Sequence, residues 1–287
     1  MKNHYISYLE LIKPRIIFGN LISMSGAFFL ASKGLINFNL LLLNIIGMFF
    51  VISSACILNN IIDCNIDKKM ERTKNRVLAI SLLPKNIMFI LAIIFFCIGI
   101  YDLYYFVNYL SMLLAILGFI FYVVFYSIYM KKNSIYSTFV GSISGAIPPV
   151  IGYCAVNNQL NICTIILLLI FIFWQVPHSY AIYIIYLKDY KNANIPVFPI
   201  KKGIWITKYY IFLYIFLFLI FSVMLTILGY TGYKYLLSTM FVGILWLYLS
   251  WTGFYIYNDI IWARKIFRFS LISIFIISIM MAIDFIN

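Results

Sequence analysis

The chain has 287 residues, of which 65% are hydrophobic and 10% are charged, and its mean hydropathy is +1.03. Soluble domains carry about 25% charged residues, so this composition excludes a soluble globular protein and predicts an integral membrane protein. The net charge of +13 would suit a nucleic-acid partner, but the basic residues flank apolar runs, as expected beside a lipid bilayer. We therefore expect a membrane partner and no nucleic acid.

Nine predominantly apolar runs follow one another along the chain, each close to the roughly 20 apolar residues that a transmembrane helix needs. The predicted spans are Ile16–Ser32, Leu40–Asn59, Asn86–Phe106, Tyr109–Met130, Thr138–Ala155, Cys163–Tyr186, Tyr209–Tyr230, Leu236–Tyr257 and Phe267–Phe285. This pattern predicts an all-α fold, a polytopic bundle of nine transmembrane helices that forms one integral-membrane domain over residues 1–287.

The distribution of positive charge predicts the orientation of the bundle. Of the 21 Lys and Arg residues, only Lys33 and Lys234 fall on one side of the predicted membrane. Cytoplasmic loops carry an excess of Lys and Arg. We therefore expect the N-terminus in the cytoplasm and the C-terminus on the outer face. The five cysteines form no Cys-x-x-Cys pair and are interpreted as small apolar residues.

A cluster of polar side chains follows the second predicted span, in the segment NNIIDCNIDKKMERTKNR. If the second helix continues beyond the membrane boundary, Asn60, Asp63 and Asp67 lie at positions i, i+3 and i+7 and share one helix face. Carboxylate and amide oxygens arranged in this way suit Mg²⁺, which takes one or two protein carboxylates together with phosphate oxygens and water. The spacing therefore predicts a magnesium site.

Three basic residues, Arg72, Lys74 and Arg76, come directly after these acids. The planar fork of arginine matches phosphate oxygens, and lysine adds a compact positive charge. Alternatively, these residues are only the charges of a cytoplasmic loop. That alternative explains the carboxylates less well, because acidic residues contribute little to topology and are costly near hydrocarbon.

A second polar loop, YLKDYKNANIPVFPIKKG, follows the sixth predicted span and falls on the same side of the membrane. Asp189 is its one acidic residue, and Lys188 precedes it directly. Pro196 and Pro199 prevent a helix from running straight through the loop. This loop is therefore a candidate second anion-binding segment.

One histidine, His178, lies inside or near the sixth span in the segment FWQVPHSY, where Pro177 predicts a kink. An ionisable residue within the membrane is a functional candidate; a neutral, hydrogen-bonded histidine in a helix interface is the alternative. In the fifth span, the segment GSISGAIPPVIG combines small residues with Pro148 and Pro149. This combination suits a cavity wall, and ordinary close packing of helices is the alternative.

Two anion-binding clusters at one cytoplasmic entrance, above an aromatic and apolar bundle, predict a ligand with a charged head and an apolar body. An isoprenoid diphosphate has this shape. Mg²⁺ held by Asp63 and Asp67 would neutralise the diphosphate and stabilise it as a leaving group. The bundle would shield the resulting allylic cation from water. We therefore expect a cavity that opens toward the cytoplasmic side.

The pattern Asn-x-x-Asp-x-x-x-Asp at Asn60, Asp63 and Asp67 resembles the first aspartate-rich motif of the UbiA superfamily of intramembrane prenyltransferases. The segments LIKPRIIFGNLIS, DKKMERTKNRVL, GSISGAIPPVIGYCAVNN and FWQVPHSYAIYIIYLKDYKNANIPVFPIKKGI extend the resemblance over nearly the whole chain. The aspartate motif is typical of the superfamily as a whole, whereas the PHSY and KDY segments resemble its haem-modifying branch.

The resemblance implies a bacterial inner-membrane enzyme that transfers a farnesyl group from farnesyl diphosphate to a vinyl group of haem B, adding water, to give haem O. The product would pass to a terminal oxidase or a haem A synthase. The implied roles are Mg²⁺ binding by Asn60, Asp63 and Asp67, diphosphate binding by Asn60, Arg72, Lys74, Arg76 and Lys188, catalysis by Asp63, Asp67 and Asp189, and haem positioning by His178.

The chain departs from many superfamily members in one respect. Their second Asp-x-x-x-Asp motif is reduced here to Asp189 with neighbouring lysines, which disfavours a second Mg²⁺ bound fully by carboxylates. Three other functions remain open at this point: a prenyltransferase for a quinone-type acceptor, a membrane transporter, and a haem carrier. A transporter would favour ionisable residues near the middle of the membrane, whereas the acids here lie at one rim.

Overall fold

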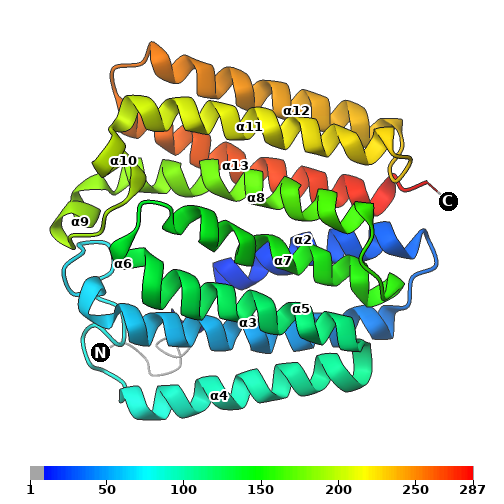
Figure 1. Ribbon diagram of the computed structural model, residues 1–287, viewed down its shortest axis with the longest axis horizontal. Helices are drawn as coiled ribbons and strands as arrows, with labels where there is room; N and C mark the ends of the chain where they lie inside the picture. The colour runs from blue at the N-terminus through cyan, green and yellow to red at the C-terminus, as the bar shows by residue number, and fades with distance from the viewer. Residues whose placement is uncertain (1–9, 287) are drawn as a thin grey trace.

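The computed structural model describes residues 10–286. In that part of the chain, nine helical segments are long and apolar enough to cross a membrane. They are α2 (Pro14–Ser32), α3 (Phe38–Asp67), α4 with the π-helix η1 (Lys85–Asp102, Leu103–Val107), α5 with the π-helix η2 and α6 (Tyr109–Ile120, Phe121–Met130, Lys131–Asn133), α7 (Ser137–Asn157), α8 (Ile162–Ile185), α11 (Ile204–Ile227), α12 with the 3-10 helix η3 (Tyr233–Trp251, Thr252–Phe254) and α13 (Asp259–Ile283) (Figure 1). The predicted all-α, polytopic bundle is confirmed.

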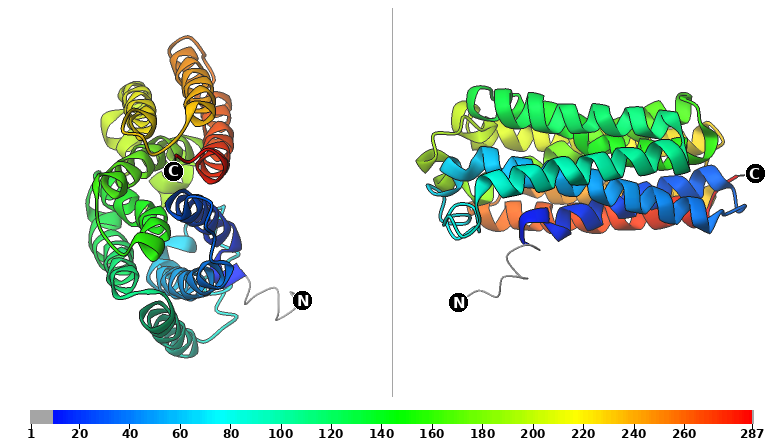
Figure 2. Two further views of the ribbon diagram at one scale, coloured as in Figure 1. Left: turned by 90° about the vertical axis from the view of Figure 1, so that its right-hand side faces the viewer. Right: turned by 90° about the horizontal axis from the view of Figure 1, so that it is seen from below.

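The helices lie side by side, and α4 and α12 occupy opposite edges of the arrangement (Figure 2). Helix α2 packs against α7 and α13, and α8 packs against α7, α11 and α13. These four helices, α2, α7, α8 and α13, therefore form the centre of the bundle. The largest cluster of buried apolar side chains runs through them, and burial of this surface away from solvent and lipid positions the polar residues at the helix ends.

Two glycines permit the close contacts of α2 with its neighbours. A Cβ atom on Gly152 of α7 would lie 2.0 Å from the backbone oxygen of Met24, and one on Gly26 of α2 would lie 2.6 Å from that of Ser278 in α13. Only glycine allows backbones to approach this closely. For the segment from residue 141 to residue 152, the structure shows the close packing that was the alternative to a cavity wall, and its tightest point is at Gly152.

Prolines affect the helices and the loops differently. Helix α7 continues through Pro148 and Pro149, and α8 continues through Pro177, because neighbouring helices pack around each of these sites. In the connection between α8 and α11, the chain instead forms two short helices, α9 (Leu187–Asn192) and α10 (Phe198–Lys202). The predicted break in that loop is confirmed.

The largest differences from the predicted spans are at helix ends. Helix α3 continues to Asp67, eight residues past its predicted end, and α13 begins at Asp259 instead of Phe267. Asn258 caps α13 by accepting a hydrogen bond of 3.1 Å from the Ile261 amide. Hydrophobicity detects only the part of a helix within the hydrocarbon, so polar terminal turns were missed.

Candidate active site

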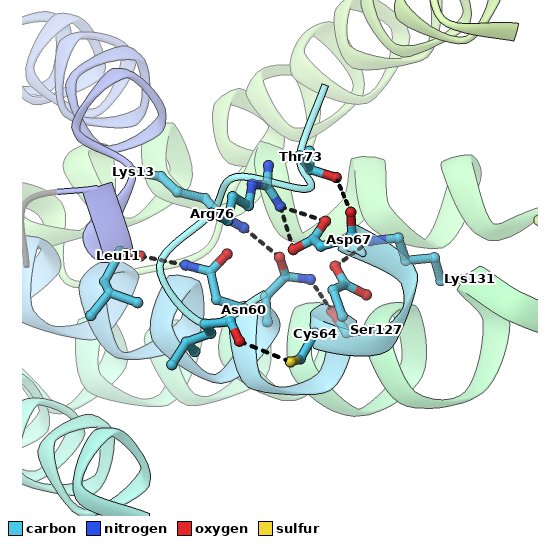
Figure 3. A network of polar contacts seen from close by, with 12 residues as sticks. Leu11, Lys13, Asn60, Cys64, Asp67, Thr73, Arg76, Ser127 and Lys131 are labelled. Atoms are coloured by element: carbon cyan, nitrogen blue, oxygen red, sulfur yellow. Dashed lines mark hydrogen bonds and ion pairs between the residues drawn. The ribbon is translucent and has the colours of Figure 1, made fainter. Parts of the chain in front are cut away.

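The last two turns of α3 carry three buried polar side chains, Asn60, Asp63 and Asp67, each at most 5% exposed. The Asn60 amide donates a hydrogen bond of 2.8 Å to the Leu11 carbonyl, and Figure 3 shows Asn60 and Asp67 within one polar network. Because α3 extends to Asp67, the three residues lie on one helix face, as their spacing predicted.

Each of the two carboxylates is paired with a cation. Arg76 Nη1 lies 3.0 and 2.9 Å from the two oxygens of Asp67, and Lys131 Nζ forms an ion pair with Asp63 Oδ2. Thr73 Oγ1 donates a hydrogen bond of 3.2 Å to the Asp67 carbonyl, which folds the following loop back over the end of α3. The loop thereby brings Arg76 back to the carboxylate of Asp67, nine positions earlier in the chain.

Two buried oxygens in this cluster, Asn60 Oδ1 and Asp63 Oδ1, have no hydrogen-bond partner among the described residues. Leaving a buried acceptor unpaired costs about 1–3 kcal/mol, and more if it is charged. Such acceptors fit a bound cation. No group of three or more His, Cys, Asp and Glu side chains in residues 10–286 could hold a metal. The donor set of two carboxylates and one amide nevertheless fits Mg²⁺, which relies on phosphate and water for its other ligands.

The loop between α8 and α11 meets the loop after α3 at Asp189. This residue is 7% exposed, and its Oδ2 accepts a hydrogen bond of 3.1 Å from the Arg72 backbone amide. The Arg72 guanidinium stacks over the Tyr186 ring, 4.7 Å from its centroid. Burial raises the pKa of the neighbouring Tyr190 hydroxyl, so this phenol stays neutral. The two predicted anion-binding loops therefore form one continuous surface.

Two of the predicted diphosphate-binding residues lie outside this network. Lys74 pairs with Glu71 at 2.5 Å, and their side chains are 47% and 73% exposed. Lys188 is also exposed. The structure thus brings together Asn60, Asp63, Asp67, Arg76 and, through the Arg72 backbone, Asp189. It leaves Lys74 and Lys188 on the surrounding surface.

Four residues of the site were not identified from the sequence: Lys13, Asn59, Ser127 and Lys131. Lys13 Nζ donates a hydrogen bond to Asn59 Oδ1, and the Asn59 amide donates one of 3.1 Å to Ser127 Oγ. The predicted topology placed both lysines on the same side as the acids, and this was the available signal. The sequence pattern does not indicate that the side chains of these two lysines point toward the end of α3.

Lys13 precedes α2 in a left-handed conformation, with φ of 54°. Non-glycine residues rarely adopt this conformation, and here it directs the side chain toward the end of α3, as Figure 3 shows. Burial lowers the pKa of the Lys13 ammonium to about 8, and Cys56 acts in the opposite direction. Lys13 therefore titrates close to neutral pH, unlike an exposed lysine.

His178 lies seven residues before the end of α8, about 10 Å along the helix axis from that end. Its ring stacks against Trp174 and packs against Phe267, with centroids 5.0 and 4.9 Å away. Its Nδ1 lies 2.7 Å from Ser270 Oγ, which itself donates to the Phe267 carbonyl. Nδ1 is therefore assigned as the protonated nitrogen, and Nε2 retains its lone pair.

A small pocket of about 10 Å³ adjoins the acids and is lined by Glu10, Leu11, Asn60, Asp67, Arg76, Val77 and Leu78. A pocket of this volume holds about one water molecule. Its polar wall is the network described above.

A family model described as the UbiA prenyltransferase family matches residues 20–274. The chain belongs to the UbiA prenyltransferase family. The resemblance inferred from the aspartate motif is therefore confirmed, and with nine apolar helices in residues 10–286 this UbiA family member is a multi-pass membrane protein. A protoheme IX farnesyltransferase of Yersinia pseudotuberculosis serotype O:1b is 52% identical over 278 residues, which cover 97% of this chain and 94% of that relative.

Two solved structures share the UbiA fold. One, of digeranylgeranylglyceryl phosphate synthase, has a TM-score of 0.79 and 22% identity and covers 97% of each chain. The other, a UbiA homolog from Archaeoglobus fulgidus bound to DMAPP and Mg²⁺, has a TM-score of 0.70 and 11% identity, and covers 93% of this chain and 99% of that one. At these identities, the likeness establishes the arrangement of helices.

Proposed function

We propose that this UbiA family member transfers the farnesyl group of farnesyl diphosphate to a vinyl group of protohaem IX, with addition of water, and so forms haem O. The observation that carries the proposal is the pair of buried, unpartnered oxygens, Asn60 Oδ1 and Asp63 Oδ1, beside the Asp67 carboxylate. The 52% identity to a protoheme IX farnesyltransferase supports haem as the acceptor. We also propose that residues 1–287 form a single domain.

In this proposal, Asn60, Asp63 and Asp67 hold Mg²⁺. The Archaeoglobus fulgidus homolog, whose structure contains Mg²⁺ with DMAPP, supports this assignment at the level of the fold. Bound Mg²⁺ would neutralise charge on the diphosphate and make it a better leaving group. The carboxylates orient the headgroup at the end of α3, so that its isoprenoid chain extends between the helices.

Four basic side chains bind the diphosphate in this scheme: Arg72, Lys74, Arg76 and Lys188. Arg76 already lies in the network, while the exposed Lys74 and Lys188 can turn toward a bound anion because no packing holds them in place. Asp189 fixes the backbone at Arg72 and thereby sets the position of the loop that carries these cations. We also assign the Asp189 carboxylate a catalytic role.

The reaction begins when the bond between the farnesyl carbon and the diphosphate oxygen breaks and leaves an allylic cation. A vinyl carbon of the haem attacks this cation, water adds its hydroxyl to the other vinyl carbon, and one proton is released. The aromatic walls exclude other water from the cation. His178 positions the haem: its Nε2 lone pair is available to the iron, while Ser270 holds the ring through Nδ1.

We further propose a cytoplasmic location for the α9 end of the bundle in the bacterial inner membrane, with the N-terminus inside, the C-terminus outside and the cavity open to the cytoplasm. The excess of Lys and Arg at that end supports this orientation. An acceptor that enters from the bilayer and a product that remains in it suit delivery to a terminal oxidase or a haem A synthase.

The decisive experiment incubates the purified protein with haem B, farnesyl diphosphate and Mg²⁺ and analyses the extracted haems by mass spectrometry. The expected product is heavier than haem B by the mass of one farnesyl group and one hydroxyl group. No product from the wild type, alongside an active control enzyme, would overturn the proposal. Parallel reactions with a quinone precursor test the alternative acceptor. Bound but unmodified haem would indicate a carrier, and uptake into vesicles without product would indicate a transporter.

Haem positioning by His178 is tested by replacing it with alanine and titrating the protein with haem B. The expected result is a shifted Soret band and a weaker haem affinity, with an unchanged KM for farnesyl diphosphate, because the His178 ring packs among Trp174, Ser270 and Phe267. Phe269→Leu, at a neighbouring partly buried position of α13, is the matched control. Identical spectra for His178→Ala and the wild type would contradict iron ligation.

A further inference from the structure

An extended π-helix positions one side of the site. Helix η2 runs for ten residues, Phe121–Met130, and its pattern continues into the amide of Lys131, which bonds to the carbonyl of Tyr126 five residues earlier. π-Helices are rare, are usually a single turn long and are frequent at functional sites. A π-helix of ten residues is therefore expected to orient a side chain that matters for the site.

The effect of η2 is on the direction of Lys131. Tyr122 and Lys131 are nine positions apart, which is about two and a half turns of an α-helix but about two turns of a π-helix. An α-helix would place Lys131 on the face opposite Tyr122. In η2 the two residues instead lie on the same side as Tyr126, whose ring stacks on Tyr122 with centroids 5.7 Å apart and lies 5.8 Å from Lys131 Nζ. The π-helix thus directs Lys131 toward Asp63.

This contact occupies only one of the two oxygens of the Asp63 carboxylate. Lys131 Nζ pairs with Oδ2, while Oδ1 is buried without a hydrogen-bond partner. The Lys131 side chain is 16% exposed, and its ammonium also lies 5.8 Å from the centroid of the Tyr126 ring. A divalent cation on Asp63 would therefore lie close to an ammonium of the same sign, in a setting with little solvent to screen the repulsion.

We propose that Lys131 competes with the divalent cation for Asp63 and moves to the diphosphate when that cation binds, an inference that rests on the proposed function. Metal and diphosphate then bind as a coupled pair. The cation alone must displace Lys131, whereas the anion gives the displaced ammonium a new partner. Lys131 thereby disfavours loading of the site with metal before the substrate is present.

The test measures binding without haem or isoprenoid, using Mn²⁺ alone and then inorganic pyrophosphate in the presence of Mn²⁺. Lys131→Met is expected to bind Mn²⁺ about tenfold more tightly than the wild type, and pyrophosphate about tenfold more weakly. These opposite shifts distinguish competition from structural damage, which would weaken both. Lys132→Met, at the adjacent exposed position, is the matched control and should match the wild type in both titrations.

Lys131→Arg provides a second variant if the methionine protein does not fold. A guanidinium holds a carboxylate through two hydrogen bonds, so Mn²⁺ should bind this variant more weakly than the wild type. Equal Mn²⁺ affinities in the wild type and the Lys131 variants would overturn the role of Lys131 alone. Absence of Mn²⁺ binding by the wild type and by Lys131→Met, both with and without pyrophosphate, would overturn both that role and the proposed metal site, whereas the haem product assay tests the reaction independently.

Discussion

The backbone amide of Arg72 donates a hydrogen bond of 3.1 Å to Asp189 Oδ2, which joins two loops that are 117 residues apart in the chain. One loop follows the acidic end of α3, and the other follows α8, the helix that carries His178. Because the donor is a backbone group, the identity of the Arg72 side chain does not determine this contact. The contact couples the two sides of the site, and Asp189 is where it can be broken.

Replacement of Asp189 by alanine removes the acceptor and frees the Arg72 loop. A hydrogen bond to a charged group contributes about 1.5–3 kcal/mol, so we expect kcat/KM for farnesyl diphosphate to fall by about 10- to 150-fold. Asp189→Asn retains an acceptor oxygen, so its kcat/KM should fall less than that of Asp189→Ala. Steady-state kinetics with both variants check this order, and equal losses would show that the charge of Asp189 matters more than its hydrogen bond.

Asp63→Asn and Asp67→Asn should each reduce turnover by about 10³-fold, because an amide is a weaker ligand for a divalent cation and loses the negative charge. Haem binding, followed by absorbance, should be unaffected. The matched control is Glu71→Gln, since Glu71 is an acidic residue of the following loop whose side chain is 73% exposed. Full activity in both aspartate variants would refute the metal role and favour a non-catalytic haem carrier.

The pKa of about 8 for Lys13 predicts a pH dependence near neutrality. Below this pH the ammonium is charged and attracts diphosphate, and above it the amine is neutral. We therefore expect kcat/KM for farnesyl diphosphate to fall about tenfold between pH 7 and pH 9. Lys13→Arg should abolish this fall because a guanidinium stays charged. The same decrease in Lys13→Arg would assign the titration to another group.

Stability depends on the contact between Gly152 and α2. Gly152→Ala places a methyl group 2.0 Å from the Met24 oxygen and should destabilise the protein by at least the 1–3 kcal/mol typical of overpacking. Gly19→Ala is the control, because a Cβ atom there meets nothing within 4 Å and alanine is the better helix former. Thermal unfolding in detergent should show a lower Tm for Gly152→Ala only.

The sequence was sufficient to predict the nine spans and the shared face of Asn60, Asp63 and Asp67. Both follow from local rules, since hydrocarbon thickness sets the length of a span and helical periodicity sets a face. The meeting of the two polar loops also followed, because topology alone places them at one end of the bundle. The contact between Arg72 and Asp189 then required the folded chain, since nothing local specifies it.

The direction of the Lys131 side chain could not be predicted, because residue spacing indicates a helix face only at 3.6 residues per turn and η2 departs from that value over ten residues. The direction of Lys13 could not be predicted for a related reason, since its left-handed backbone conformation is rare for a non-glycine residue. Arg72 illustrates a third case: its charge predicted anion binding, yet its guanidinium lies over the Tyr186 ring. Each of these orientations is determined by tertiary packing.

The cations around the α3 acids also define an electrical balance. Lys13, Arg76 and Lys131 together with Asp63 and Asp67 leave one net positive charge. A divalent cation and a diphosphate trianion would bring the sum to zero, whereas either alone would leave a buried excess that is costly in a medium of low polarity. Within this group of five residues, charge balance therefore favours binding of the metal together with the diphosphate, and release of the metal once pyrophosphate has departed.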